Sequence, residues 1–532
     1  MGQFSHATEP WTRTRVIGLL LGPLLAVILY HLLPDKIRDD AGNLLASLSS
    51  EGRMTIAIGA WLATWWVTEA IAIEAAALLP LVAFPLVGVS DFASTAAPYA
   101  DEVVYLFLGG MLMGSAMERW NLHKRLALLV MVRLGASPHR LIAGLLLATA
   151  LLSMWVSNTA ACVMMLPIAI GVVKLARERH ASVSGSLIDP IAPQPALDPP
   201  SRNFGIAAML AIAYGASIGG VGTLVGSPPN GVAAAFITRT YDDTLTFAQW
   251  LRFGLPTMLL TLPICWGLLA LLFPTRGLRV EGAGQMLRND LKQLGKVTRG
   301  EWLVMGVFAL ASIFWIFRPQ LAGLLGLTRM NDAGRTIVLL SDAGIAITAS
   351  LLMFLIPVHL KHATMLLDWK TARTIPWGVL LLFGGGLALA AAVERHQVDE
   401  VLAALLHGLT GVHPLVVVLV VVAGAMFLSE IGSNTAVATV LLPVVATAAP
   451  VLGVHPYMLI FGVTLAVSLA FMMPSGTPPN ALVFSSGYLR VPQMVRAGFL
   501  LNLACVLVIT MVVYGLSGVL GLMPDIAPRL NQ

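Results

Sequence analysis

The sequence predicts an all-α polytopic membrane protein, with about 11 transmembrane helices and two re-entrant hairpins arranged as an inverted two-fold repeat. The chain is 57% hydrophobic and only 11% charged, whereas ordinary soluble domains carry about 25% charged residues. Most of its 532 residues fall in apolar runs near or above the roughly 18 residues that cross a bilayer. A short polar motif also occurs twice in these apolar surroundings, as Ser157-Asn158-Thr159-Ala160 and Ser433-Asn434-Thr435-Ala436.

Eleven apolar runs are expected to cross the membrane as helices. They lie near residues 16–33, 54–74, 76–90, 103–118, 205–237, 251–274, 301–317, 336–357, 376–393, 457–487 and 496–522. The first run follows Arg13 and Arg15 in the way a signal peptide would, but no small-residue cleavage site comes after it. We therefore expect a retained first helix.

Two further apolar segments, 140–176 and 412–450, are interrupted in the middle by the repeated motif. Each is too long for one crossing and has short limbs if it crosses twice. Basic residues flank the first segment at both ends, which places both ends on the cytoplasmic side. A re-entrant hairpin meets this condition, because irregular backbone is tolerated at membrane depth where protein or water surrounds it.

The distribution of charge then orients the whole chain. With the N-terminus in the cytoplasm, most Lys and Arg residues fall in cytoplasmic loops. The first hairpin opens to the cytoplasmic face and the second to the external face, so the repeats have opposite orientations. The chain is expected to have five parts: an N-terminal helix with an external loop (1–53), a first repeat (54–275), a cytoplasmic linker with a connecting helix (276–335), a second repeat (336–523) and a C-terminal tail (524–532). The first repeat contains its hairpin at 140–176 and a broken helix at 205–237. The second repeat contains its hairpin at 412–450 and a broken helix at 457–487.

Each half contains a second interruption after its hairpin, Gly226-Ser227-Pro228-Pro229-Asn230 and Gly476-Thr477-Pro478-Pro479-Asn480. Proline lacks a backbone donor and clashes with the preceding turn, so the helix stays broken there. Freed helix N-termini attract an anion, while carbonyl, hydroxyl and amide oxygens coordinate a small hard cation. Gly/Pro-interrupted segments at matching places of two halves point to a transporter binding site. We expect two cation pockets flanking one anion pocket.

Other classes of protein fit the sequence less well. The net charge of +5 reflects basic cytoplasmic loops, so we expect no nucleic-acid partner. Residues 215–219 fit the Gly-x-Ser-x-Gly pattern of a hydrolase nucleophile, but they lie in a Gly/Ala-rich membrane helix, where small residues permit close packing. We therefore expect neither an enzyme nor an organic cofactor. A channel is the other class considered, and the inverted repeat argues against it.

Glu430 lies three residues before the second motif, and the residue at the same place before the first motif is Met154. Glu430 is therefore outside the symmetric pattern. Ionisable residues inside a membrane are costly and usually functional, so a proton-coupling role stays open. The sequence favours a structural acid bonded within the second hairpin.

The combination of motifs resembles the divalent anion:sodium symporter family, which contains sodium-dependent dicarboxylate, citrate and sulfate carriers. The stretches that carry the resemblance, besides the four motifs, are Trp65-Trp66-Val67-Thr68-Glu69-Ala70, Leu78-Leu79-Pro80-Leu81 and Phe471-Met472-Met473-Pro474-Ser475. The resemblance covers about residues 54–523. It implies a homodimer in which a transport domain moves against a scaffold domain by an elevator motion, with Na+ as the coupling ion.

The resemblance also assigns roles to individual residues. The first sodium ion would be held by Ser153, Ser157, Asn158 and Gly226, and the second by Ser429, Gly432, Asn434 and Gly476. The substrate carboxylates would meet Asn158, Thr159, Ser227, Ser433, Asn434, Thr435, Thr477 and Pro478.

These observations together lead to an expectation about function. We expect a secondary active transporter of the inner (plasma) membrane that imports small divalent anions, above all C4-dicarboxylates such as succinate. No Lys or Arg lies in the four motifs, so helix ends, amides, hydroxyls and bound cations would have to meet the anion's charge, which favours coupling to sodium. A sodium-independent dicarboxylate or tricarboxylate exchanger and a sulfate carrier are the alternatives.

Overall fold

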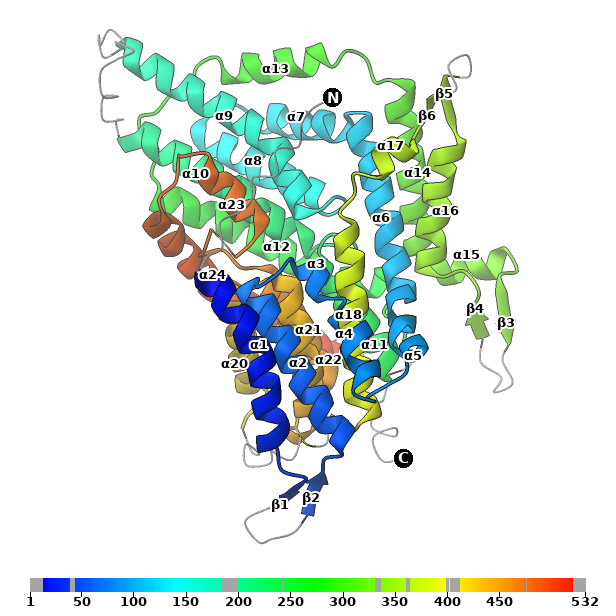
Figure 1. Ribbon diagram of the computed structural model, residues 1–532. Helices are drawn as coiled ribbons and strands as arrows, with labels where there is room; N and C mark the ends of the chain where they lie inside the picture. Colours follow the sequence, from blue (N-terminus) through cyan, green and yellow to red (C-terminus); the bar gives the residue numbers. More distant parts are fainter. Residues whose placement is uncertain are drawn as a thin grey trace.

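The computed structural model describes residues 13–38, 44–183, 199–241, 243–330, 336–359, 364–398, 401, 412–474 and 476–519. Helices make up most of the described part, and its strands form three short antiparallel pairs. Several long helices run close to the vertical direction of Figure 1, and others in its upper part lie obliquely or across it. This is the predicted all-α architecture of a polytopic membrane protein.

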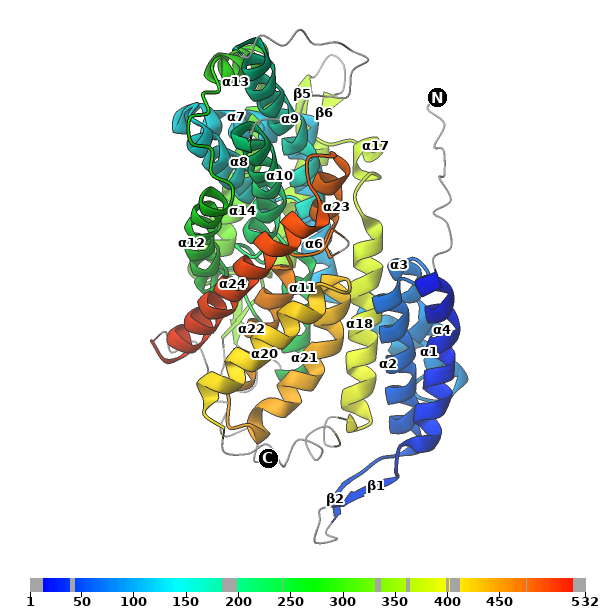
Figure 2. The same ribbon diagram turned by 90° about the vertical axis from the view of Figure 1, so that its left-hand side faces the viewer.

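The N-terminal helices form a layer beside the rest of the molecule, at the right of Figure 2. The elements up to the first long buried helix are α1 (Arg13–Leu32), β1 (Lys36–Arg38), β2 (Leu44–Ser47), α2 (Ser50–Thr68), α3 (Ile73–Ala76), α4 (Leu79–Leu86), α5 (Phe92–Ala96) and the 3-10 helix η1 (Ala97–Ala100). The Ser49 side chain begins α2 by accepting a hydrogen bond from the Gly52 N–H. Because α2 begins at Ser50, the boundary expected at residue 53, between the N-terminal part and the first repeat, falls inside this helix.

The expected crossing at 76–90 is not one continuous helix. This stretch contains the end of α3 and the whole of α4, which have four and eight residues. Pro80 lies in the first turn of α4, and Pro85 lies inside it. Since a proline removes a backbone donor and clashes with the preceding turn, the apolar run is divided into short helices. Neither helix alone has the roughly 20 residues of a transmembrane helix.

The first half continues with long helices around the first hairpin. They are α6 (Glu102–Arg119), α7 (Leu122–Leu134), α8 (Pro138–Ser153), α9 (Asn158–Val183), α10 (Pro199–Gly220), α11 (Pro228–Tyr241) and α12 (Phe247–Leu272). Their buried side chains are almost all apolar, and α10 is buried along nearly its whole length. The first broken helix therefore lies largely inside the protein.

A connecting region and the second half complete the chain. The connecting elements are α13 (Ala283–Gln293), α14 (Arg299–Ile316), α15 (Arg318–Leu324), β3 (Thr328–Met330), β4 (Thr336–Val338), α16 (Asp342–Leu355), β5 (Pro357–His359), β6 (Thr364–Met365) and α17 (Trp369–Ala372). The second half contains α18 (Trp377–Arg395), α20 (Pro414–Ser429), α21 (Asn434–Val451), α22 (Pro456–Ser468), α23 (Pro478–Ser485) and α24 (Val491–Val519). In Figure 2, α18 lies between the N-terminal layer and the helices of the second hairpin.

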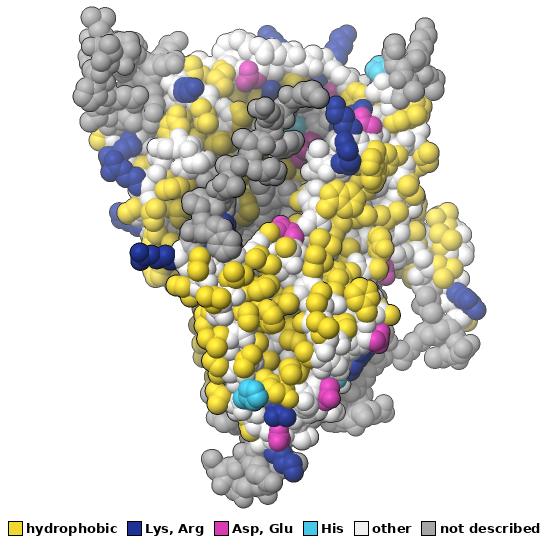
Figure 3. Space-filling model, in the orientation of Figure 1, with side chains coloured by type: hydrophobic (Ala, Val, Ile, Leu, Met, Phe, Trp, Pro, Cys, Tyr) yellow, Lys and Arg dark blue, Asp and Glu magenta, His cyan; other side chains and the backbone are white. Residues whose placement is uncertain are grey.

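Nine helices of the described part are long and apolar enough to cross a membrane, among them α9 and α21 of the two hairpins. The outer face of α1 and α2 is almost continuously hydrophobic (Figure 3), and it includes Leu20, Leu24 and Val27, which are more than half exposed. A large exposed apolar surface is costly in water. It is explained here by contact with the hydrocarbon of a bilayer.

The two halves meet at side chains that occupy matching places in the sequence. Phe107 of α6 and Phe383 of α18 contact each other edge to face, with ring centroids 4.8 Å apart. Gly109 of α6 packs against Ala346, and Gly385 of α18 packs against Ala77 so closely that a Cβ at either glycine would overlap its neighbour. Small residues thus bring the helices into backbone contact on both sides of the Phe107–Phe383 pair.

Candidate functional site

Both hairpins turn at the repeated motif. Helix α8 ends at Ser153 and α9 begins at Asn158, while α20 ends at Ser429 and α21 begins at Asn434. In Figure 2, the α8–α9 hairpin lies in the upper part of the molecule and the α20–α21 hairpin in the lower part, so their tips point toward its middle. The first backbone N–H groups of α9 and α21 have no partner within their own helices. Each tip therefore presents a helix N-terminus, which favours a negative charge.

A hydroxyl, an amide and a main-chain carbonyl meet at the second tip. The Ser429 hydroxyl lies 2.7 Å from Asn434 Oδ1 and 2.8 Å from the carbonyl oxygen of Val467, near the end of α22. A hydroxyl has one proton, so Ser429 donates to only one of these two oxygens at a time. The tip therefore holds a cluster of oxygen atoms with fewer donors than acceptors, which suits a small hard cation.

The first tip repeats this arrangement. The Ser153 hydroxyl lies 2.7 Å from Asn158 Oδ1 and 2.7 Å from the carbonyl oxygen of Ala216. The same end of the Asn158 amide also faces the carbonyls of Ala216 and Gly226, at 3.1 and 3.2 Å. Turned with its nitrogen toward them, the amide has three oxygens within reach of its two N–H donors; turned with its oxygen toward them, it completes an oxygen cluster. The first tip thus presents a cluster of oxygen atoms in one amide orientation and satisfies more of its own hydrogen bonds in the other.

Each broken helix is held by the asparagine of its Pro-Pro-Asn motif. Between α10 and α11, Asn230 Nδ2 donates to the carbonyls of Gly220 and Thr223, at 3.0 and 2.8 Å. Between α22 and α23, Asn480 Nδ2 donates to the carbonyls of Ala470 and Met473, at 3.3 and 3.0 Å. Both asparagines are fully buried. They stabilise the unwound segments by satisfying carbonyls that an intact helix would have paired.

Two glycines allow the first tip to touch the first broken helix. A Cβ on Gly220 would lie 2.3 Å from Asn158 Oδ1, and a Cβ on Gly226 would lie 2.6 Å from the Gly220 carbonyl oxygen. Any larger residue would push the tip and the unwound segment apart. The cluster around Asn158 therefore depends on these close backbone approaches.

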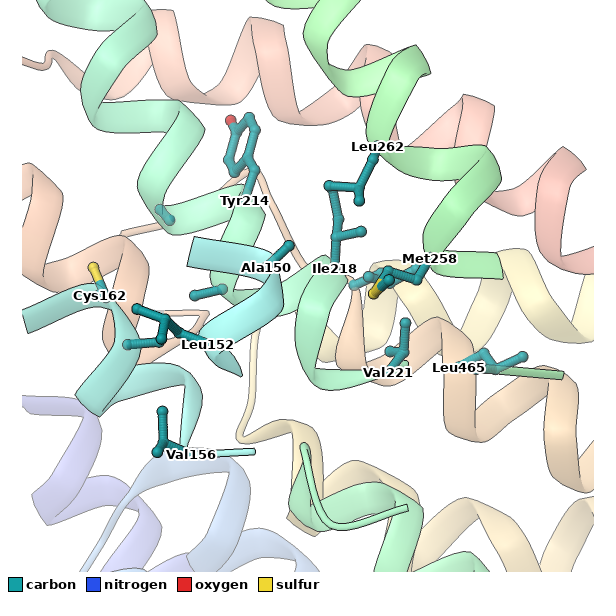
Figure 4. Packing of buried hydrophobic residues seen from close by; sticks show 14 of the residues in the cluster. Ala150, Leu152, Val156, Cys162, Tyr214, Ile218, Val221, Met258, Leu262 and Leu465 are labelled. Carbon is teal, nitrogen blue, oxygen red and sulfur yellow. The ribbon is translucent and has the colours of Figure 1, made fainter. Parts of the chain in front are cut away.

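Contacts between the halves bring the two broken helices to the same place. The hydroxyl oxygens of Ser227 and Ser468 are 3.2 Å apart, and the Tyr214 hydroxyl donates to the Phe471 carbonyl at 3.1 Å. The apolar side chains around these groups exclude water: in Figure 4, Ile218 of α10 and Leu262 of α12 point toward each other beside Met258. The hydroxyls of Ser227, Ser468 and Tyr214 thus lie inside an apolar core, whereas Asn158 and Asn434 at the hairpin tips are partly exposed.

The predicted site residues are only partly connected by direct contacts. Ser153, Asn158 and Gly226 meet at the first tip, and Ser429 meets Asn434 at the second. The nearest atoms to a Cβ on Gly432 would belong to Val437 and to Val67 of α2, so this glycine faces the N-terminal layer. The remaining predicted residues have no direct hydrogen bond to one another in the described part; they are Ser157, Thr159, Ser227, Ser433, Thr435, Gly476, Thr477 and Pro478. Ser157, Thr159 and Ser433 are half-buried, Thr435 and Thr477 are buried, and Pro478 is exposed.

Several groups that form the site were not predicted from the sequence. The carbonyls of Ala216 and Val467 contact the two serine hydroxyls, but a backbone carbonyl has no signature in sequence. Asn230 and Asn480 were available as a signal, because they end the two copies of the Pro-Pro-Asn motif. Asn502, a buried amide within the apolar helix α24, could have been found as a polar residue that is costly in a membrane helix.

Two hairpins and two broken helices at matching places of two halves, in a protein with many membrane-length helices, define a secondary membrane transporter. A profile of the sodium:sulfate symporter transmembrane region matches residues 44–523. The chain therefore belongs to the sodium:sulfate symporter family, the divalent anion:sodium symporters named above, and it is a transporter and not an enzyme.

Characterised relatives match the chain over almost its whole length. It is 39% identical over 504 residues to the sodium-dependent dicarboxylate transporter SdcS of Staphylococcus saprophyticus. The aligned region covers 94% of this chain and 91% of the relative. It is 37% identical over 513 residues to the protein of the same name from Staphylococcus aureus, with 96% and 92% covered.

Two solved transporter structures resemble the fold. The YdaH transporter of Alcanivorax borkumensis has a TM-score of 0.52 at 16% identity, with 96% of this chain and 99% of that chain covered. MtrF of Neisseria gonorrhoeae has a TM-score of 0.54 at 12% identity, with 95% of each chain covered. At these identities the likeness concerns the fold alone.

Proposed function

We propose that this transporter imports small divalent anions, above all C4-dicarboxylates such as succinate, and that inward sodium movement drives the import. The observation that supports this most is the duplicated cluster of a serine hydroxyl, an asparagine amide and a main-chain carbonyl at the two hairpin tips. The relatives that are 37–39% identical are named sodium-dependent dicarboxylate transporters, and this supports the same substrate class here.

In this proposal, neutral oxygen atoms hold the two sodium ions. The first ion is assigned to Ser153, Ser157, Asn158 and the backbone of Gly226, and the second to Ser429, Gly432, Asn434 and the backbone of Gly476. Bound sodium supplies positive charge beside the anion. The asparagine amides orient the hydroxyls, and the apolar core keeps water away, which strengthens each electrostatic contact.

The dianion is assigned to the space between the two tips. The residues proposed to meet its carboxylates are Asn158, Thr159, Ser227, Ser433, Asn434, Thr435, Thr477 and Pro478. Because no Lys or Arg lies in the motifs, its charge is balanced by the N-termini of α9 and α21, by hydroxyl and amide donors, and by the two cations.

We further propose an elevator motion of a transport domain against a scaffold domain, in a homodimer whose N-termini are cytoplasmic and which resides in the inner membrane. The arrangement that supports this is the N-terminal layer, which lies beside the rest of the molecule (Figure 2) and contacts it through α18 and α21. The division into an N-terminal part (1–53), two repeats (54–275 and 336–523), a linker (276–335) and a tail (524–532) stays part of this proposal.

Uptake of radiolabelled succinate into proteoliposomes that contain the purified full chain tests the function. We expect uptake that requires an inward sodium gradient, that fails when choline replaces sodium, and that needs no dicarboxylate inside. Uptake that requires internal dicarboxylate and ignores sodium would instead identify an exchanger. A sodium-dependent uptake of sulfate in place of succinate would identify a sulfate carrier.

A further inference from the structure

The Glu430 carboxylate lies at the second hairpin tip and accepts five close contacts from four donors. Its Oε1 accepts from the backbone N–H of Phe471 at 2.6 Å and from Asn502 Nδ2 at 2.7 Å. The N–H of Met472 lies 3.0 Å from both carboxylate oxygens, and the N–H of Met473 donates to Oε2 at 3.1 Å. The side chain therefore connects the hairpin tip to the unwound segment before α23 and to α24. This differs from the expectation of an acid bonded within the hairpin.

The partners of this carboxylate are backbone N–H groups and one side-chain amide. Four donors face its two oxygens, an arrangement that stabilises a carboxylate by hydrogen bonding. No described Lys or Arg forms an ion pair with Glu430, which is 4% exposed. A buried anion is tolerated only when hydrogen bonds or an opposite charge stabilise it. Here three backbone N–H groups and one amide provide that stabilisation.

The carboxylate also lies beside the second proposed cation site. Glu430 directly follows Ser429, whose hydroxyl contacts Asn434. A Cβ on Gly476 would lie 3.3 Å from Glu430 Oε2, and Gly476 is the residue whose backbone we assign to the second cation. Since a negative charge in an apolar core attracts a cation strongly at such short range, the carboxylate favours a cation at this tip.

The first half has no such charge. The residue that corresponds to Glu430 is Met154. There the unwound segment is tied to the hairpin by a neutral contact, in which the Thr223 hydroxyl donates to the Met154 carbonyl. The two halves therefore repeat the oxygen cluster but not the way in which the neighbouring backbone is held.

We propose that Glu430 is a positioning residue that makes the two cation sites unequal: it holds residues 471–473 against the second hairpin tip and adds a negative charge at that tip alone. This inference rests on the proposed sodium coupling. It follows that the second site binds sodium more tightly than the first, and that the second half is ordered before the first as sodium rises.

The test compares Glu430→Gln with Asn502→Ala in the purified full chain. Glutamine keeps the size of the side chain but removes its charge and turns one of its acceptors into a donor that faces the loop N–H groups. Alanine at 502 removes one neutral donor and leaves the carboxylate and its three backbone contacts in place. The readouts are the sodium concentration that gives half-maximal succinate uptake, the KM for succinate at saturating sodium, and the rise in Tm when sodium replaces choline without substrate.

We expect Glu430→Gln to raise the half-saturating sodium concentration about tenfold, the size of one lost hydrogen bond to a charged group. Its sodium-induced rise in Tm should shrink, and its KM for succinate at saturating sodium should change less than about threefold. Asn502→Ala should lower Tm but keep the wild-type response to sodium. If Glu430→Gln does not fold, Glu430→Asp replaces it, since the shorter side chain cannot reach the same N–H groups and should also raise the half-saturating sodium concentration.

The outcomes separate this inference from the proposed function. A wild-type protein whose uptake and Tm ignore sodium would overturn the proposed coupling and this inference with it. A sodium-dependent wild type whose Glu430→Gln or Glu430→Asp variant keeps the same half-saturating sodium concentration would overturn the role of Glu430 alone. An equal loss of sodium response in Asn502→Ala and Glu430→Gln would reduce Glu430 to a packing role and contradict the proposal.

Discussion

Asn158 and Asn434 are the first residues of α9 and α21. The side-chain oxygen of each accepts a hydrogen bond from a serine five residues earlier in the chain. Neither side chain is charged, so each can lie inside an apolar core without the penalty of a buried ion. Each amide nevertheless offers an oxygen for a cation and a nitrogen for an acceptor. A carbonyl from a broken helix completes the group in both halves. At this scale the structure shows what the asparagine of each motif contacts.

Replacing Asn158 by alanine removes the amide that contacts Ser153 and faces the carbonyls of Ala216 and Gly226. We expect Asn158→Ala to abolish sodium-driven uptake and the sodium-induced rise in Tm, because the first oxygen cluster loses its central member. The neighbouring substitution Thr159→Ala is the control: it should raise the KM for succinate about tenfold and change the half-saturating sodium concentration less. Normal transport by Asn158→Ala would show that the site has been assigned to the wrong residues.

Helices α8 and α10 are in backbone contact, and this contact brings the first broken helix to the first hairpin. A Cβ on Gly215 would lie 2.7 Å from the Leu146 carbonyl oxygen, and a Cβ on Gly219 would lie 2.1 Å from that of Ala150. These glycines belong to the Gly-x-Ser-x-Gly pattern of residues 215–219. The pattern therefore serves close helix packing in a transporter, as membrane helices commonly use small residues.

Gly219→Ala tests this packing. The added methyl group would force α8 and α10 apart, so we expect a loss of about 1–3 kcal/mol of stability and a lower Tm in detergent. Gly306→Ala in α14 is a matched control, because a Cβ there meets nothing within 4 Å. That variant should be neutral or slightly more stable, since alanine favours a helix over glycine. Equal Tm values for the two variants would contradict the proposed backbone contact.

The stretch between α13 and α14 of the connecting region is joined to the first half by a buried ion pair and neighbouring hydrogen bonds. Arg125 of α7 donates to both carboxylate oxygens of Glu301 in α14, at 2.5 and 3.2 Å. It also donates to the carbonyls of Leu294 and Gly295, just after α13. In Figure 1, α7 and α13 lie together at the upper end of the molecule. Arg125 thus fixes the helix before the first hairpin to the region that connects the two halves.

Removing this arginine should affect the stability of the whole molecule. In Arg125→Ala, Glu301 would stay buried at 2% exposure without its cation, and losing one partner of a buried pair typically costs about 3–5 kcal/mol. Arg119→Ala is the control, because Arg119 pairs with the half-exposed Asp368, and such a pair contributes about 1 kcal/mol or less. Thermal unfolding in detergent should therefore show a much larger decrease in Tm for Arg125→Ala. Similar decreases for both variants would contradict a special role for the buried pair.

The sequence by itself determined the class of fold, the two hairpin turns and the two helix breaks. These features are local: a run of apolar residues has a fixed length across a bilayer, and a Gly/Pro interruption ends a helix wherever it occurs. Repetition of Ser157-Asn158-Thr159 and of the Pro-Pro-Asn motif then indicated a transporter, and the family match agrees with that class.

Only the tertiary structure decided which groups meet at the tips. The Ser153 hydroxyl contacts a carbonyl 63 residues away, and Glu430 contacts an N–H 41 residues away and an amide 72 residues away. Backbone carbonyls and N–H groups are the same at every position, so no residue type marks the ones that a fold will bring together. Close approaches such as Gly220 to Asn158 likewise depend on how whole helices pack. The sequence therefore names the side chains that can bind ions, and the packing of distant backbone supplies the rest of the site.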